Sequence, residues 1–188
     1  MYGISRDSLQ WFTSYLKERR QLVKLGDKRS SVAIVRHGIP QGSILGPLLF
    51  IVFINDLPLY VTSSRIDLYA DDTTLTSGTN YSSIGRLEGT LNSSIAEIVD
   101  WAASNKLPIN EGKTKAMLIT GKRLPSKINE EMTLTIKGTE LKLVPSAKLL
   151  GLEIDSELSF TSHVEKLCKK LSQRIGVLKK IRSCLAFS

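Results

Sequence analysis

Apolar residues recur at helical spacing in several stretches of the chain. The clearest are residues 81–105 and the segment from Ser162 onward, where apolar side chains return every three or four positions. A third amphipathic helix is expected from Ser5, which can cap it, to about Arg19. A fourth helix, residues 43–56, is apolar almost all round and has a proline near its first turn. We expect this last helix to be buried against another part of the protein.

Other segments have the composition of short β-strands. Residues 20–38 predict two strands around a Gly26-Asp27 turn. Residues 67–76 are rich in β-branched and aromatic residues on both sides of an Asp-Asp pair, which predicts a hairpin with that pair at its tip. Further strands are predicted for KAMLIT, MTLTI, LKLV and AKLLGLEI, with Gly138 in the hairpin between the middle two. Helices and antiparallel strands in this order predict an α+β domain with the helices on one face of the sheet.

Composition narrows the class of protein. A chain of 188 residues with 41% hydrophobic content can form one domain with a core, or one domain with an appended piece. Cys168 and Cys184 lack the spacing of a zinc site or a disulfide framework, which favours a reducing compartment. The longest apolar run, residues 44–54, is shorter than the ~20 residues that span a bilayer. No secretory signal is visible. We therefore expect a nuclear or cytoplasmic protein that is neither secreted nor in a membrane.

The net charge of +8 is unevenly distributed along the chain. Residues 1–40 carry 8 basic and 3 acidic side chains, residues 41–100 carry 2 and 7, and residues 101–188 carry 16 and 8. A basic protein with one acidic segment is typical of a polyanion binder that also has a cation site. The alternative is that the excess of Lys and Arg only keeps the domain soluble.

The acidic segment contains the adjacent pair Asp71 and Asp72. One interpretation is a simple turn, because Asp tolerates turn conformations and bonds its own backbone. The other is a metal site: two neighbouring carboxylates repel each other and need a cation, and oxygen ligands without His or Cys favour Mg²⁺ or Mn²⁺. The pair by itself does not decide between them.

Four stretches in series carry a resemblance to a known family. They read GIPQGSILGPLLFIVFINDLP, LYADDTTL, WAASNKLPINEGKTKAMLIT and KLLGLEID. In this order they resemble the palm-domain motifs of reverse transcriptases of non-LTR retrotransposons, of the jockey or LINE type, and YGIS with LQWFTSYLKERRQLVKL resembles the segment that precedes those motifs. The resemblance covers nearly the whole chain. It implies an α+β polymerase palm-type antiparallel sheet with partial fingers and palm in residues 1–160, and the start of a basic thumb-like helix in residues 161–188.

The resemblance also implies roles for individual residues. Asp71 and Asp72 would be catalytic and would hold Mg²⁺ or Mn²⁺, with Lys113 near the departing pyrophosphate. The residues that would touch the nucleotide, the template or the primer end are Gly38, Pro40, Gln41, Gly42, Ser43, Tyr69 and Ala70. Leu150 and Gly151 would belong to a primer grip. The residues that would contact the nucleic-acid backbone are Lys166, Lys169, Lys170 and Arg174.

Simpler interpretations of these residues stay open. Residues 38–43 could be a turn with a helix cap, and Lys113 could be a solvated loop lysine. The stretch LLGLEI could be an ordinary core strand, and positive charge on the last helix is a less specific signal than the other motifs.

The implied function is RNA-directed DNA polymerisation by a two-metal mechanism, with an RNA template, a DNA primer and deoxynucleoside triphosphates as partners. The family also uses an aspartate from an earlier strand, in a motif that would lie upstream of YGIS. We therefore expect a chain truncated at its N-terminus and inactive by itself. The alternatives are a non-catalytic nucleic-acid-binding remnant, or an unrelated basic α+β interaction domain with a chance Asp turn. An in-frame upstream Asp motif would favour the enzyme over the remnant.

Overall fold

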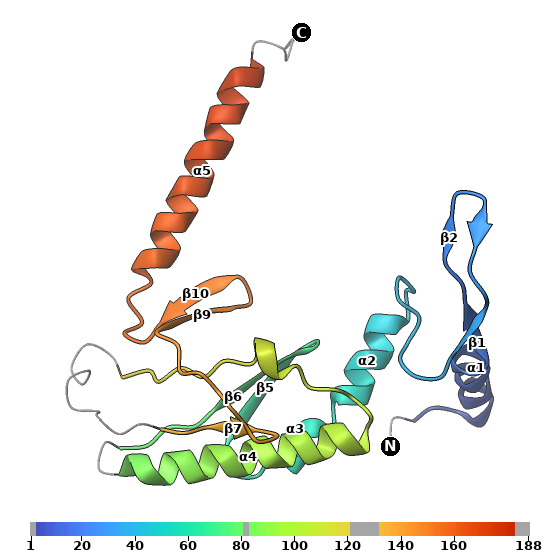
Figure 1. The fold of residues 1–188 in the computed structure, drawn as a ribbon, viewed down its shortest axis with the longest axis horizontal. Coiled ribbons are helices and arrows are strands. Elements are labelled where there is room, and N and C mark those ends of the chain that lie inside the picture. The colour runs from blue at the N-terminus through green and yellow to red at the C-terminus, as the bar shows by residue number, and fades with distance from the viewer. Residues whose placement is uncertain (1–2, 81–82, 121–131, 183–188) are drawn as a thin grey trace. The chain divides into compact units, whose positions relative to one another are not determined.

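A computed structural model of the chain describes residues 3–80, 83–120 and 132–182 (Figure 1). The described residues form short antiparallel sheets and helices, which agrees with the expected α+β class. The chain divides into two compact units. The first consists of Met1–Leu59 and Asp67–Thr74, and the second of Tyr60–Ile66 and Leu75–Ser188.

The first unit begins with helix α1, Arg6–Leu16. Ser5 caps it as predicted, because its hydroxyl accepts a hydrogen bond from the backbone N–H of Ser8 at 3.3 Å. The helix ends three residues before the predicted end at Arg19. The backbone of Lys17 is extended and Glu18 has a φ of 53°, so helical hydrogen bonding stops there.

A two-stranded ribbon follows α1. Strand β1, Arg19–Gln21, pairs antiparallel with β4, Ala33–Val35, and β2, Lys24–Leu25, pairs with β3, Lys28–Arg29. The Gly26-Asp27 turn joins β2 to β3, as predicted. We call residues 19–35 the basic ribbon.

The helix predicted for residues 43–56 is shorter and more exposed than expected. It consists of α2, Gly46–Ile54, followed by the short helix α3, Leu57–Tyr60. The expectation that this helix is buried was wrong for most of its surface: Leu48 is 57% exposed, and Ile51 and Phe53 also face solvent. Burial is confined to its two ends, since no element of the described chain covers the middle of the helix.

Strands β5, Arg65–Tyr69, and β6, Asp72–Thr76, form the predicted hairpin around the aspartate pair. In the second unit, α4, Ile84–Ser104, presents the predicted apolar face to a second hairpin. This hairpin consists of β7, Thr135–Ile136, and β8, Thr139–Glu140, with Gly138 in its turn as predicted. The predicted first residue of α4, at position 81, lies outside the described residues.

The core of the second unit lies between α4 and the β7–β8 hairpin. Its buried members are Leu87, Met132, Leu134, Ile136 and Leu141. Partly buried apolar residues surround them: Leu91, Ile95, Val99, Ile109, Ala116 and Leu118. The helical spacing of the apolar residues in α4 therefore correctly identified a core-facing surface.

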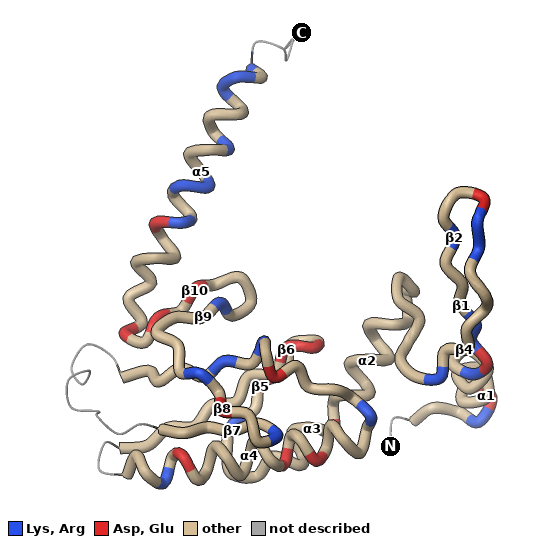
Figure 2. Tube along the Cα trace, viewed as in Figure 1, with Lys and Arg blue, Asp and Glu red and all other residues tan. Residues whose placement is uncertain are grey.

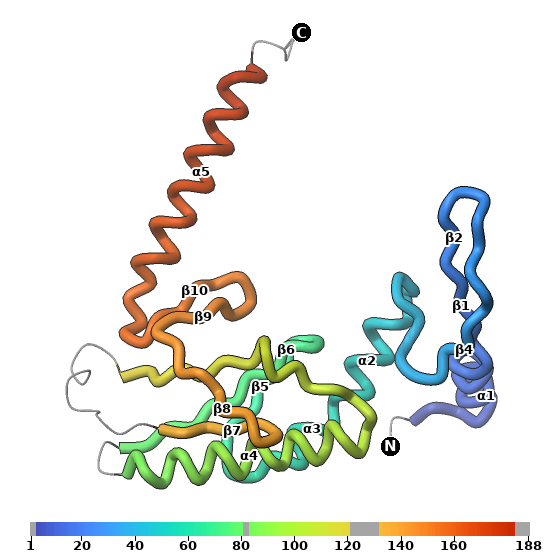
Figure 3. The backbone as a smooth tube through the Cα atoms, in the orientation of Figure 1, coloured from blue at the N-terminus to red at the C-terminus, as the bar shows by residue number. Residues whose placement is uncertain are grey.

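The expected single sheet is not formed by the described residues, which contain five two-stranded sheets instead. KAMLIT contributes only an isolated parallel bridge between Ala116 and Leu143. AKLLGLEI is not one strand but a hairpin of β9, Ser146–Leu149, and β10, Leu152–Asp155. The reason is local: Leu150 and Gly151 have φ values of 47° and 91°, which reverse the chain before a longer strand can form. Figure 3 shows the path of the backbone through the β7–β8 and β9–β10 hairpins.

The described chain ends in α5, Thr161–Ile181, close to the predicted start at Ser162. Its apolar stripe is exposed, with Leu171 and Ile175 about half accessible to solvent. Cys168 lies on this helix with its thiol free, and Cys184 lies outside the described residues. None of the described helices is both long enough and apolar enough to cross a membrane.

Candidate active site

The aspartate pair lies at the tip of the β5–β6 hairpin. Tyr69 ends β5, Ala70 and Asp71 form the two-residue turn, and Asp72 begins β6. The pair lies at the hairpin tip, as the sequence predicted, and both aspartates are exposed. Ala70 has a φ of 52°, a left-handed conformation that costs an L-residue about 1–2 kcal/mol. The hairpin therefore tolerates local strain where it presents the two carboxylates.

This donor set suits a hard divalent cation only in part. Two carboxylate groups are the ligands that Mg²⁺ uses when water and substrate oxygens complete its coordination. Among residues 3–80, 83–120 and 132–182, no group of three or more His, Cys, Asp or Glu side chains is placed to hold a metal. Asp71 and Asp72 can contribute ligands, but they do not form a complete protein cage.

The predicted nucleotide-binding turn, residues 38–43, is closed by one serine. The hydroxyl of Ser43 donates to the carbonyl of Pro40 at 2.7 Å and accepts from the backbone N–H of Gly46 at 3.0 Å. Gly38 and Gly42 have φ values of 79° and 76°, which explains glycine at both positions. Gln41 is exposed between them, so its amide is free to meet a ligand.

Gly46 belongs to the same turn, although sequence reasoning did not select it. A Cβ atom at this position would lie 2.8 Å from Ser43 Oγ and 3.0 Å from the Pro40 carbonyl oxygen. Only glycine fits there without a shift of its neighbours. The signal in the sequence is a glycine as the first residue of a helix, where a better helix former would otherwise be expected.

Arg19 is the second residue that sequence reasoning missed. Its guanidinium donates to the backbone carbonyls of His37, at 3.3 Å, and of Gly38, and its Nε donates to Leu16 at 3.1 Å. One side chain thus connects the end of α1 to the start of the turn at residues 38–43. Nothing in the spacing of Arg19 distinguishes it from the other basic residues nearby.

The candidate residues are divided between the two compact units. Residues 38–43 and the tip of the β5–β6 hairpin belong to the first unit, whereas Lys113, Leu150, Gly151 and the basic residues of α5 belong to the second. The first group is therefore part of one folded body. The meeting of the two groups in one active site stays a prediction.

Lys113 ends the short 3₁₀ helix η2, Glu111–Lys113. The side chain of Asn110 caps this turn by accepting from the backbone N–H of Lys113 at 3.2 Å. Glu111 attaches the turn to the β7–β8 hairpin, because it accepts from Thr139 at 3.2 Å and pairs with Lys137 at 3.4 Å. The Lys113 ammonium itself is exposed and available to a polyanion.

The predicted primer-grip residues form the tip of the β9–β10 hairpin. The Leu150 side chain is 56% exposed. Its backbone is left-handed, which is unusual for a bulky residue, and Gly151 completes the turn. The "ordinary core strand" interpretation of LLGLEI therefore does not describe Leu150, whose side chain faces solvent.

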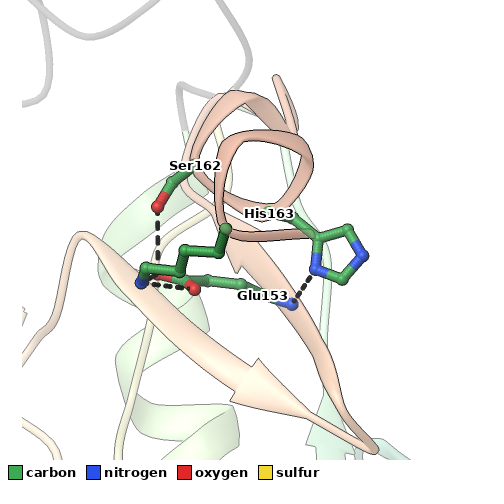
Figure 4. Close-up of polar contacts among 4 residues, drawn as sticks. Glu153, Ser162 and His163 are labelled. Atoms are coloured by element: carbon green, nitrogen blue, oxygen red, sulfur yellow. Dashed lines mark hydrogen bonds and ion pairs between the residues drawn. The ribbon is translucent and has the colours of Figure 1, made fainter. Parts of the chain in front are cut away.

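A polar cluster connects β10 to α5 (Figure 4). The Glu153 carboxylate accepts from Lys166 Nζ at 2.5 and 2.6 Å and from Ser162 Oγ at 3.2 Å, and the Glu153 backbone N–H donates to His163 Nδ1 at 3.3 Å. The hydrogen bond from Lys166 holds the pKa of Glu153 below its usual range. Lys166, predicted to contact nucleic acid, is thus already engaged within the protein.

Asp155 organises the loop that precedes α5. Its carboxylate accepts from the backbone N–H groups of Glu157 at 3.1 Å, Ser159 at 2.9 Å and Phe160 at 2.9 Å, and from Ser159 Oγ at 3.1 Å. The Ser159 N–H is the main cause that lowers the pKa of Asp155. Phe160, the N-cap residue, offers no side-chain cap, so Asp155 organises the start of the helix from five residues upstream.

Comparison with known proteins identifies the family. Residues 2–154 match the family described as reverse transcriptase (RNA-dependent DNA polymerase). The chain is 32% identical over 173 residues to a probable RNA-directed DNA polymerase from transposon BS of Drosophila melanogaster, covering 88% of this chain and 18% of that protein. It is 29% identical over 179 residues to the RNA-directed DNA polymerase from mobile element jockey of Drosophila funebris, covering 92% of this chain and 19% of that protein. No solved structure matches the chain.

The chain therefore belongs to the reverse transcriptase family. Its curated relatives place it with the enzymes of jockey-type and LINE-type non-LTR retrotransposons, as the four motifs indicated. The chain spans less than a fifth of the length of these two relatives, 18% and 19% respectively.

Proposed function

We propose that residues 1–160 form part of the palm of an RNA-directed DNA polymerase and that residues 161–188 begin its thumb. The reaction is template-directed nucleotidyl transfer, with an RNA template, a DNA primer and deoxynucleoside triphosphates as partners. The observation that carries this proposal is the exposed Asp71-Asp72 pair at a hairpin tip, in the same compact unit as the turn that Ser43 closes. We propose that the protein acts in the nucleus or the cytoplasm.

In this proposal the first unit holds the reacting groups. Asp71 and Asp72 bind Mg²⁺ or Mn²⁺, and the cation, when bound, supplies charge stabilisation for phosphoryl transfer. Tyr69 and Ala70 support the primer end beside the carboxylates. The exposed amide of Gln41 donates to or accepts from the nucleotide or the template, and the glycines around it allow the backbone to approach the ligand closely.

The second unit handles the nucleic acid and the leaving group. Lys113 places a positive charge near the departing pyrophosphate, which requires no proton transfer. Leu150 and Gly151 form the tip of a primer grip. Lys169, Lys170 and Arg174 contact the backbone from a thumb-like α5, while Lys166 fixes α5 to β10 through Glu153.

A second candidate function is nucleic-acid binding without catalysis. The observation that favours it is the limited donor set: within the described residues the Asp pair has no third carboxylate close enough to complete a metal site. We infer that polymerisation requires a further carboxylate beside Asp71 and Asp72. The two candidates then differ only in whether that residue is supplied.

A replacement experiment tests the polymerase proposal. In a hybrid protein, residues 1–188 replace the corresponding segment of the jockey polymerase of Drosophila funebris. Primer extension by this hybrid on poly(rA) with an oligo(dT) primer is then measured in Mg²⁺. The hybrid protein should extend the primer, and Asp71→Ala should reduce the rate by about 10³-fold or more. Asp27→Ala, in the exposed Gly26-Asp27 turn, is the matched control and should leave the rate unchanged. Activity that survives Asp71→Ala would contradict the proposed role of the pair.

A further inference from the structure

The basic ribbon carries positive charge that the candidate active site does not use. The β1–β4 pair continues into the β2–β3 pair through contacts between Val23 and Ser30. The Ser30 N–H donates to the Val23 carbonyl at 2.9 Å, and the Ser30 hydroxyl accepts from the Val23 N–H at 2.9 Å. Two residues separate β1 from β2, but three separate β3 from β4, which defines a β-bulge. The ribbon is therefore one continuous two-stranded element and not two separate hairpins.

Four basic side chains on the ribbon are exposed: Arg20, Lys24, Lys28 and Arg29. None of them has an ion-pair partner within the part of the chain that the structure describes. Figure 2 shows basic residues on both strands of the ribbon. Arg19 differs from these four, because its guanidinium is bound to backbone carbonyls.

The strand register places two of these charges against each other. Lys24 lies directly opposite Arg29, so both side chains project from the same face of the ribbon. Like charges at such a position destabilise a strand pair. Lys28 lies opposite Leu25, on the other face, and Leu25 is 81% exposed. Both faces of the ribbon therefore carry uncompensated positive charge that a polyanion would neutralise.

We propose that the basic ribbon binds duplex DNA by entering its major groove. The major groove of B-DNA admits a two-stranded β-ribbon, and phosphates line both of its walls, so charge on both faces of the ribbon meets a phosphate strand on each side. The deep and narrow major groove of A-form RNA does not admit such an element. This inference is independent of the polymerase proposal, because none of the four basic residues belongs to the candidate active site.

The test measures binding of the 188-residue chain to a closed dumbbell DNA duplex, which offers no primer terminus, by fluorescence anisotropy between ~50 and 200 mM salt. The double variant Lys24→Gln/Arg29→Gln should weaken binding. It should also flatten the plot of log K against log salt concentration by about 1.8, the slope of two phosphate contacts. The charge-preserving variant Lys24→Arg/Arg29→Lys should bind like the parent chain. Arg20→Gln/Lys28→Gln should reproduce the loss, so the result does not rest on the folding of a single variant.

The matched control removes two charges from elsewhere in the chain. Lys106→Gln/Lys142→Gln lowers the net charge equally and changes exposed lysines of the second unit, so the slope should stay that of the parent. An equal loss of slope in the control would overturn the proposal, since the effect would then depend on net charge alone. An equal loss with a duplex RNA dumbbell would also overturn it, and so would competition by poly(glutamate) as effective as that by DNA. Either of these last two results would show that the ribbon recognises negative charge in general and does not depend on the major groove of DNA.

Discussion

Single atoms decide the shape of the turn that precedes α2. The hydroxyl of Ser43 bonds to Pro40 on one side and to Gly46 on the other, and the missing side chain of Gly46 leaves room for both contacts. The turn therefore requires both the hydroxyl of Ser43 and the lack of a side chain at Gly46. Its backbone geometry matters because Gln41 projects from the middle of it.

We expect Gly46→Ala to destabilise this turn by about 1–3 kcal/mol, because the added methyl group overlaps Ser43 Oγ and a backbone oxygen. Hydrogen exchange of the amides of residues 43–49 measures the effect. Gly89→Ala is the matched control: a Cβ atom there meets nothing within 4 Å, and alanine should stabilise α4 by about 0.5–1 kcal/mol. Equal behaviour of the two variants would show that Gly46 is not sterically required.

The aspartate pair can be tested for cation binding without any assay of activity. Mn²⁺ added to the 188-residue chain should broaden the amide NMR signals of residues 69–73 at lower concentrations than those of other segments, because two adjacent carboxylates attract a hard cation. Asp71→Ala should abolish this selectivity. The control region is Asp27, a single exposed aspartate in the Gly26-Asp27 turn. Equally strong broadening around Asp27 would show that Asp71 and Asp72 have no special affinity for the cation and form an ordinary turn.

At the scale of elements, the start of α5 depends on groups that lie outside the helix. Asp155 accepts backbone hydrogen bonds from the loop, and Glu153 binds Lys166 in the second turn of the helix. The helix therefore starts at a fixed place relative to β10. Leu150 at the tip of the β9–β10 hairpin and the basic residues of α5 are consequently parts of one connected segment.

Asp155 makes the start of α5 sensitive to acid. Its pKa is lowered in the folded state, so its contribution to stability is fully present above the ordinary Asp pKa of ~3.9 and is lost as the pH falls through the lower folded value. We expect the amides of Ser159 and Phe160 to lose protection from exchange in that pH range before the middle of α5 does. Asp155→Asn should show weaker protection at neutral pH and little further change on acidification. Asp100→Asn, an exposed position on α4, should keep the parent's pH dependence.

At the scale of the whole molecule, Asp71 and Asp72 are the two carboxylates that we propose as metal ligands. Mg²⁺ demands near-octahedral geometry and dehydrates reluctantly, so a site with two protein carboxylates holds it loosely and mostly through water. Positioning and charge stabilisation carry most of the rate in phosphoryl transfer. We therefore propose that the 188 residues bind nucleic acid without supporting appreciable synthesis.

We expect the 188-residue chain, tested alone, to extend a primer on poly(rA) no faster than its own Asp71→Ala variant. The hybrid polymerase described above should separate the same two proteins by about 10³-fold or more. Extension by the 188-residue chain that Asp71→Ala abolishes would contradict this expectation. Another carboxylate of the chain, with Asp67 as the nearest candidate, would then have to complete the site.

The sequence alone determined the family, the long helices and the position of the aspartate pair. These features depend on short-range patterns: helical spacing of apolar residues in α4 and α5, and β-branched residues on both sides of Asp71 and Asp72. The Gly26-Asp27 and Gly138 turns were predictable for the same reason. Each rests on the backbone preferences of a few neighbouring residues, so no knowledge of distant contacts was needed.

Only the tertiary structure decided the features that depend on which atoms meet. The exposure of α2 could not be predicted from its composition, because an apolar helix becomes buried only where another element covers it. The separation into two-stranded sheets followed from left-handed residues such as Leu150, which sequence patterns do not reveal. The hydrogen bonds of Arg19 to His37 and Gly38 join residues 18 and 19 positions apart, and those of Glu153 to Lys166 span 13. Such contacts depend on the path of the chain between the partners, so the tertiary structure was needed to find them.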